Sequence, residues 1–197
     1  MRQKILIFLL IVLTMPSLGQ KVEKKFSVGL KFSQNIPTTG LQTKTEEQEF
    51  YVKDDFFYTI GIGLNYSISN RLSIISRIDF MKQPLIQKSL HYQGFTVRRR
   101  TIVYSDFERK IIQVPFGIRF YLTNKKMKIF SQLGLIKNFD YNHDENLKQH
   151  LNGFAGIGID LKINENYQLD FITEIQNSFG ELKYSFLSIG FEIKRFF

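Results

Sequence analysis

Residues 111–136 constrain the fold more than any other part of this chain. In the first half of this stretch, Gln113, Pro115, Gly117, Arg119 and Tyr121 alternate with large apolar residues: Ile112, Val114, Phe116, Ile118, Phe120 and Leu122. The same alternation resumes after the polar residues 123–126. A period of two indicates strands with one apolar and one polar face. The stretch therefore predicts a β-hairpin.

Eight segments with this alternation occur along the chain. They span residues 25–34, 57–68, 72–82, 111–122, 127–136, 151–163, 167–176 and 184–197. Each is close to the length of a tilted strand that crosses a bilayer, roughly 9 to 11 residues. The links alternate between short turns (69–71, 123–126, 164–166) and longer loops (36–55, 83–109, 138–149, 177–183). Within 83–109, the β-forming residues 96–104 favour a continuation of the third and fourth strands above the membrane.

This arrangement is typical of bacterial outer-membrane barrels, which have an even number of strands, short periplasmic turns and long outer loops. The predicted fold class is therefore all-β: an eight-stranded antiparallel up-and-down transmembrane β-barrel with short periplasmic turns and longer outer loops. A soluble, lipocalin-like barrel is the alternative. Recovery of the chain in the soluble periplasmic fraction would favour it.

Two features indicate that the apolar face points outward into lipid. The interior of an eight-stranded barrel is just filled by side chains, so the large apolar residues of eight strands do not fit inside. A narrow interior also needs small residues, and most strand glycines share the phase of the polar residues: Gly29, Gly61, Gly63, Gly117, Gly134, Gly156, Gly158 and Gly190. Gly153 is the exception, on the apolar phase.

Charged residues in the phase of these glycines are predicted to face the interior. Five are basic and five are acidic: Lys31, Arg77, Arg119, Lys162 and Lys194, with Asp79, Asp160, Asp170, Glu174 and Glu192. They form either an ion pathway or a plug of charge pairs, in which each partner offsets the desolvation of the other. We expect the plug, because an eight-stranded interior is narrow.

Both ends of the chain are predicted to carry signals for export. Arg2 and Lys4 precede an apolar run at 5–13, and small residues follow at 17–19. This pattern predicts a signal peptide at 1–19 and a barrel domain at 20–197. Phe197 ends the last strand on its apolar phase, as in chains delivered to the outer-membrane assembly machinery; the alternative is an ordinary C-terminal phenylalanine. Cysteine is absent, so no disulfide framework is expected.

Residues 112–122, with Pro115, Arg119 and Tyr121, resemble the Pro-containing strand of the Bacteroidetes-type outer-membrane β-barrel family often called PorT-like. Proline inside a paired strand also predicts a local bulge. The resemblance implies a barrel in the outer membrane of a Gram-negative cell. The namesake members assist protein secretion by the type IX route, and no residue here marks that activity.

No motif points to catalysis, a metal or a cofactor. His91, His143 and His150 lie in or beside predicted outer loops, yet no serine lies between 138 and 152 to act as a nucleophile with His150. Ser178 and Ser185 are the nearest candidates. A lipid-A-modifying enzyme therefore remains an alternative to a non-enzymatic barrel.

Arg98, Arg99 and Arg100 form a basic patch in the loop 83–109. The patch predicts a contact with anionic lipopolysaccharide phosphates or an acidic protein partner. Alternatively, it is a charged edge that discourages aggregation, or it pairs with the acidic residues of the loop 36–55. The net charge of +9 suits a neighbour of anionic lipid head groups, and no nucleic acid is expected as a partner.

The sequence therefore predicts a non-enzymatic outer-membrane barrel with a plugged interior and a structural, scaffolding or interaction role. The expected contacts are outer-membrane lipid, the assembly machinery during biogenesis, and a protein partner at the outer loops. An accessory subunit of a secretion or assembly machine is the alternative within the same class.

Overall fold

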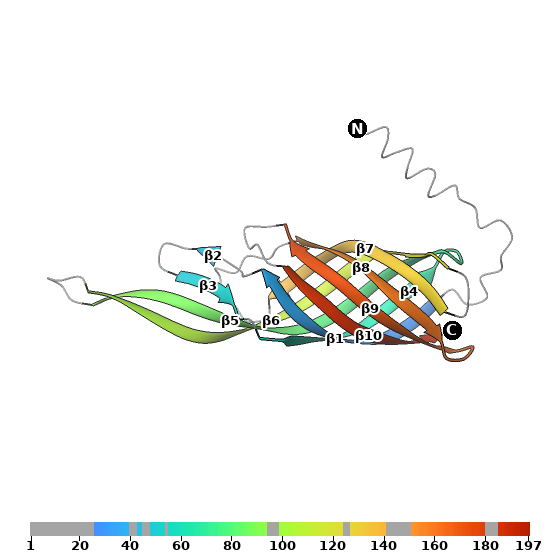
Figure 1. Cartoon of the computed structure of the whole chain (residues 1–197), viewed down its shortest axis with the longest axis horizontal. Helices are drawn as coiled ribbons and strands as arrows, with labels where there is room; N and C mark the ends of the chain where they lie inside the picture. The colour runs from blue at the N-terminus through green and yellow to red at the C-terminus, as the bar shows by residue number, and fades with distance from the viewer. Residues whose placement is uncertain are drawn as a thin grey trace, which may run out of the picture.

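Eight long strands close into an antiparallel barrel in the computed structural model, which describes residues 26–39, 43–44, 48–53, 55–93, 99–123, 127–140, 151–179 and 185–197 (Figure 1). The strands are β1 (Phe26–Thr39), β4 (Phe57–Ser67), β5 (Leu72–Gln93), β6 (Arg99–Tyr121), β7 (Met127–Asp140), β8 (Leu151–Lys162), β9 (Tyr167–Ser178) and β10 (Ser185–Phe196). Each pairs with its neighbour in this series, and β1 pairs with β10 to close the ring. The predicted fold class is confirmed.

The two ends of the barrel differ. At one end, here called the turn end, short turns connect β4 to β5 and β8 to β9. The Asn164 side-chain oxygen accepts hydrogen bonds from the backbone N–H groups of Asn166 and Tyr167, both at 2.9 Å. Ser69 accepts from the N–H of Leu72 in the same way, at 3.1 Å. These short polar side chains fix the tight reversals that their positions in the sequence predict.

At the opposite end, here called the loop end, β5 and β6 run far beyond the barrel wall as one protruding hairpin (Figure 1). Their pairing continues to Gln93↔Arg99. Above Met81, β5 no longer pairs with β4. It pairs instead with β3 (Gln48–Val52), which carries the two-residue strand β2 (Thr43–Lys44). The predicted continuation of these two strands is therefore confirmed, and most of the link 83–109 is strand.

Pro115 interrupts the β5–β6 ladder without displacing it. The cross-strand pairs stop at Ser76↔Phe116 and resume at Asp79↔Gln113 with the same offset, so no residue is inserted. The bulge predicted at this proline is therefore wrong. A missing N–H removes one hydrogen bond from the ladder, and the pairs on either side preserve the register.

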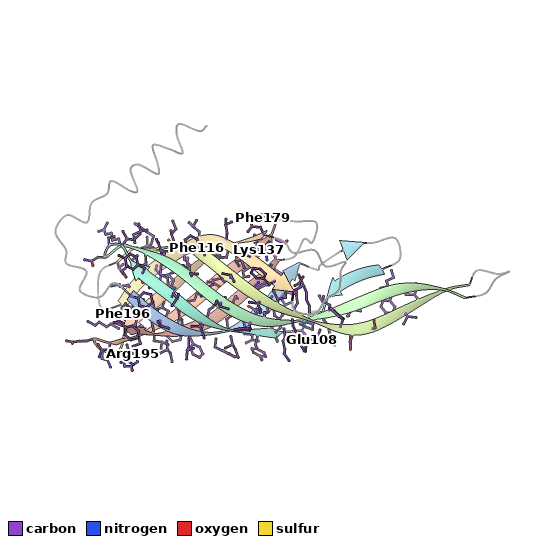
Figure 2. All side chains as sticks on the ribbon, turned by 180° about the vertical axis from the view of Figure 1, so that it is seen from behind. Glu108, Phe116, Lys137, Phe179, Arg195 and Phe196 are labelled. Carbon is purple, nitrogen blue, oxygen red and sulfur yellow. The ribbon has the colours of Figure 1, made fainter. Side chains whose placement is uncertain are left out.

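The barrel is polar inside and apolar outside. Among the described residues, 24 polar or charged side chains are buried against 11 apolar ones. Large apolar side chains stand out around the wall, and Phe116 is 60% exposed (Figure 2). The predicted orientation of the two faces is confirmed. The described residues include no helix long and apolar enough to cross a membrane. The predicted signal peptide lies outside the described residues.

An abrupt change marks the upper limit of the apolar surface. Ile60, Phe80, Ile112 and Phe139 are partners across four neighbouring strands and form one apolar row. The next row toward the loop end holds Tyr58 and two paired lysines, Lys82↔Lys110. Tyrosine and lysine are residues that favour the boundary between hydrocarbon and water. We therefore place the edge of the hydrocarbon between these two rows.

Glycines make room for the side chains that fill the interior. Gly117 and Gly134 are cross-strand partners beneath the Phe154 ring. A Cβ atom on Gly134 would lie 2.6 Å from the Cα atom of Gly117 and 2.7 Å from the Phe154 ring. Gly153, the exception in phase, lies outside against the ring of Phe179. The interior is thus packed closely enough that these positions accept no side chain.

Gly134→Val is expected to destabilise the barrel by about 1–3 kcal/mol or more, because the added atoms overlap a backbone that cannot move away. The measurement is urea unfolding of the refolded chain in lipid vesicles, followed by far-ultraviolet circular dichroism because the chain has no Trp. Ala155→Val, on the exposed face of β8, is the matched control and should change stability little. Equal stability of both variants would contradict the close packing.

Candidate functional site

The centre of the barrel interior is organised around the buried carboxylate of Glu174 on β9. The Lys31 ammonium lies 2.6 Å from Glu174 Oε2, and Arg77 Nη1 lies 2.8 Å from Oε1. Arg77 Nε is also 3.4 Å from Asp79. All four side chains are at most 2% exposed. Strands β1, β5 and β9 are far apart in sequence, and closure of the ring brings their charges together.

A second cluster lies nearer the turn end, around Asp170. Arg119 donates a hydrogen bond to the Asp170 carboxylate, and Lys194 Nζ is 2.7 Å from the same oxygen. Gln168 donates to the other oxygen at 3.0 Å. Arg119 also lies 3.6 Å from Glu192. The carboxylate of Asp170 thus compensates two buried cations.

Gln132 of β7 joins the two clusters. Its amide nitrogen donates to Glu174 Oε1, and its amide oxygen accepts from Arg119 Nε at 3.0 Å. The result is one network of eight charged side chains and a glutamine, drawn from six strands. We call it the interior network: Lys31, Arg77, Asp79, Arg119, Gln132, Asp170, Glu174, Glu192 and Lys194.

Aromatic rings complete the packing around the network. The guanidinium carbon of Arg119 lies 4.0 Å from the centre of the Phe130 ring, and that of Arg77 lies 5.5 Å from the Phe154 ring. Both rings are buried. Contacts of this kind stabilise a cation that has left water. The sequence prediction missed these inward aromatics, although Phe130 and Phe154 each precede an interior glycine in the same phase.

Polar and apolar layers continue toward the loop end. Gln113 donates to Asn138 at 3.1 Å and faces Gln176 at 3.4 Å. Beyond them lies a buried apolar cluster drawn from four strands: Phe57, Met81, Leu85, Ile111 and Phe186. Arg109 forms a two-bond pair with Asp140 at 2.9 and 2.8 Å. Arg109 falls in a predicted loop. It shares the phase of the interior residue Gln113, and this could have predicted its inward position.

The structure places the other predicted interior charges as follows. Asp160 is buried, and its cross-strand partner is Asp170. Lys162 is exposed, so its predicted interior position is wrong. It is the last residue of β8, two residues after Asp160 and the next position on the same face, and the barrel ends there. Phase alone does not reveal where along the axis an interior-facing position meets water.

The remaining predicted sites lie at the two ends of the molecule. Arg98 is outside the described residues, and only the backbone of Arg99 and Arg100 is described, at the start of β6. Phe197 is 62% exposed at the turn end, with its ring centre 6.4 Å from that of Phe26. His143 and His150 lie outside the described residues, as does the side chain of His91. No group of potential metal ligands occurs among the residues described.

Comparison with known proteins places this architecture in a family. The model of the outer membrane protein beta-barrel domain matches residues 5–194. No curated protein matches the chain. Among solved structures, OprG from Pseudomonas aeruginosa has a TM-score of 0.60 at 11% identity, over 87% of this chain and 95% of that one.

Two further structures share the fold. Neisserial surface protein A has a TM-score of 0.55 at 11% identity, covering 87% of this chain and 97% of that chain. Ail of Yersinia pestis, in complex with the heparin analogue sucrose octasulfate, has a TM-score of 0.50 at 13% identity, covering 88% and 99%. At such identities these structures show the fold alone. The family model spans nearly the whole chain, and the chain therefore belongs to the outer membrane protein β-barrel domain family, whose location is the outer membrane.

Proposed function

We propose that this protein is a non-enzymatic outer-membrane barrel with a structural or scaffolding role, and that its interior is closed to solutes. One observation supports this proposal above all. The interior network fills the cross-section of the barrel with side chains from six strands (β1, β5, β6, β7, β9 and β10), and each cation faces a carboxylate. The apolar cluster around Phe57 adds a second layer toward the loop end. A conducting pathway would need mobile charges beside continuous water, and these charges are paired and packed.

The purified full chain, inserted in planar bilayers, is therefore expected to give no steady ion conductance. Insertion is checked in the same preparation by the change in gel mobility on heating that folded barrels show. An open porin in the same lipid supplies the positive control. Steady current steps from the inserted chain would contradict the closed interior.

The protruding hairpin supports an interaction role for the loop end. In the topology of this family the short turns face the periplasm, so the hairpin stands on the outer side. Two contacts are consistent with the charge of this hairpin. The basic residues 98–100 would bind either lipopolysaccharide phosphates or an acidic protein. A cavity of about 920 Å³ at the hairpin base, lined in part by Tyr58, Phe80 and Lys110, lies at the hydrocarbon edge and suits an outer-leaflet lipid.

A second candidate is an accessory subunit of a secretion or assembly machine, as the PorT-like resemblance implies. The protruding sheet favours it, because β5 and β6 extend beyond the barrel wall and offer a surface to a protein partner (Figure 1). Co-purification from native membranes in mild detergent separates the two: a constant set of partner proteins favours the subunit. Mass spectrometry of lipid A from a deletion strain tests the remaining alternative, a lipid-A-modifying enzyme.

Export and assembly complete the proposal. The residues 1–19 act as the signal peptide, and Phe197 is the terminal aromatic that the outer-membrane assembly machinery engages during biogenesis. Its ring is exposed at the turn end and is accessible from that side.

A further inference from the structure

The protruding sheet has one covered edge and one uncovered edge. On the β5 side, β3 pairs with β5 from Val52↔Leu85 to Gln48↔Ser89. On the β6 side, pairing with β7 ends at Ile111↔Asp140. In the part of the chain that the structure describes, residues 99–106 of β6 pair with β5 alone. Among the described residues, β3 therefore covers the β5 edge of this hairpin along residues 85–89, and the β6 edge along residues 99–106 is open (Figure 1).

The hydrogen-bond phase of β6 shows which backbone groups reach the open edge. Tyr121 donates its N–H to the carbonyl of Arg71 on the β5 side, and Leu122 donates to Ile129 on the β7 side. Neighbours along a strand point these groups to opposite sides. The β5–β6 offset is the same from Leu72↔Phe120 to Gln93↔Arg99. Even-numbered residues therefore direct their backbone groups away from β5, toward the open edge: Ile102, Tyr104 and Asp106.

Between the charges of Arg100 and Asp106, residues 102–105 carry none of the usual protections of an edge strand. Residues 102–106 read Ile-Val-Tyr-Ser-Asp, without proline or glycine, and all five side chains are exposed. Tyr104 is 65% exposed and Ile102 is 50% exposed. The Asp106 carboxylate lies 3.8 Å from Lys53, and its backbone groups still point outward. Exposed edges normally carry charged side chains, proline or bulges, so an edge of good β-formers without them is a template for pairing with another strand.

The chemistry of the edge selects the occupant. Unpaired N–H and C=O groups at strand spacing are matched by another extended backbone. Residues 98–106 contain three arginines and one aspartate, a net charge of +2, so an acidic strand complements this edge better than a second copy of the same edge does. We propose that residues 99–106 of β6 bind an extended acidic segment of a partner protein, which adds to the protruding sheet as a further strand. This proposal names the partner class for the interaction role above and rests on that role.

The test measures binding of a synthetic eight-residue peptide of alternating Val and Glu, labelled with fluorescein, to the full chain in nanodiscs. Saturable binding that weakens with added salt is expected, because charge and backbone pairing act together. Tyr104→Pro removes an N–H at the open edge while the ladder to β5 stays intact, and it should weaken binding about tenfold. Replacing residues 98–100 by serine should also weaken binding about tenfold and flatten the salt dependence.

Tyr104→Ser is the matched control, because it removes the ring and keeps the N–H. It should bind the peptide within about threefold of the original chain. Circular dichroism and heat-dependent gel mobility confirm folding, and Ile102→Pro replaces Tyr104→Pro if that variant does not fold. A peptide with Lys in place of Glu should not bind.

Four outcomes would overturn the proposal: no saturable binding of the acidic peptide, unchanged binding by the folded proline variant, equal loss in Tyr104→Ser, or dimerisation in the ultracentrifuge that Tyr104→Pro abolishes. The last would identify a second copy as the occupant. A conducting barrel would refute the closed interior without changing peptide binding, so the two proposals fail separately.

Discussion

Glu174→Ala is expected to destabilise the folded barrel by about 3–5 kcal/mol, the usual cost of removing one partner from a buried charge pair. The change removes the ion pair of the buried Lys31 ammonium, 1% exposed, and leaves it with no carboxylate within 4 Å among the described residues. Arg77 retains Asp79 alone, at 3.4 Å. The interior network would then hold four cations and three carboxylates, so one buried cation would lack a counter-charge. Urea titration in lipid vesicles, followed by circular dichroism, measures the free energy of unfolding.

The matched control is Lys82→Ala on the outer surface. Lys82 lies 3.4 Å from Glu108, and both side chains are more than half exposed. Water screens such a pair, so a change within about 0.5 kcal/mol is expected. The double variant Lys31→Met with Glu174→Met should lose less than the sum of its single changes, because no unpaired charge remains. Equal effects of Glu174→Ala and Lys82→Ala would show that the interior is wet and open.

Ile62→Arg should cost about 2–4 kcal/mol, the second largest effect expected, because Ile62 lies in the middle of β4 on the lipid side. Its side chain is 51% exposed on the barrel surface, so protein packing contributes little to the loss. The same unfolding measurement applies. The cost arises from moving a guanidinium into hydrocarbon, and it should vanish when the barrel is refolded in short-chain detergent micelles that admit water.

Tyr58→Arg provides the depth control on the same strand. Tyr58 belongs to the row with Lys82 and Lys110, above the proposed edge of the hydrocarbon. A cost of about 0–1 kcal/mol is expected there. Equal costs at Ile62 and Tyr58 would mean that the apolar rows do not mark the membrane, and the position of the barrel in the bilayer would have to be revised.

The period of two gave the faces of the strands correctly, because alternation is a local property of an extended chain. Arg119 and Glu174 could be placed inside on that basis alone. Which charged residues pair with each other could not be predicted. Lys31 and Glu174 are 143 positions apart, and their contact depends on ring closure and on the stagger between strands. Gln132 links the two clusters because the stagger between strands places it between Arg119 and Glu174. In the sequence it looks like any other interior amide.

The upper half of the hairpin shows a second limit. Along residues 102–106 both faces of β6 are exposed, so alternation no longer distinguishes them. Only the β-forming character of residues 101–104 remains as a signal. The inward positions of Phe130 and Phe154 were missed because these residues break the alternation of their strands. An apolar residue on the polar phase looks like noise in the pattern, while in the barrel each ring lies over a glycine on a neighbouring strand.

The continuity of β5 and β6 has a mechanical consequence. No hinge separates the protruding part from the wall, because the same two strands form both. A partner that pulls on the hairpin along its length would load many ladder hydrogen bonds in shear at once, and the embedded ring would carry the tension. If a partner binds the hairpin as proposed, the barrel would therefore resist a pull on that partner.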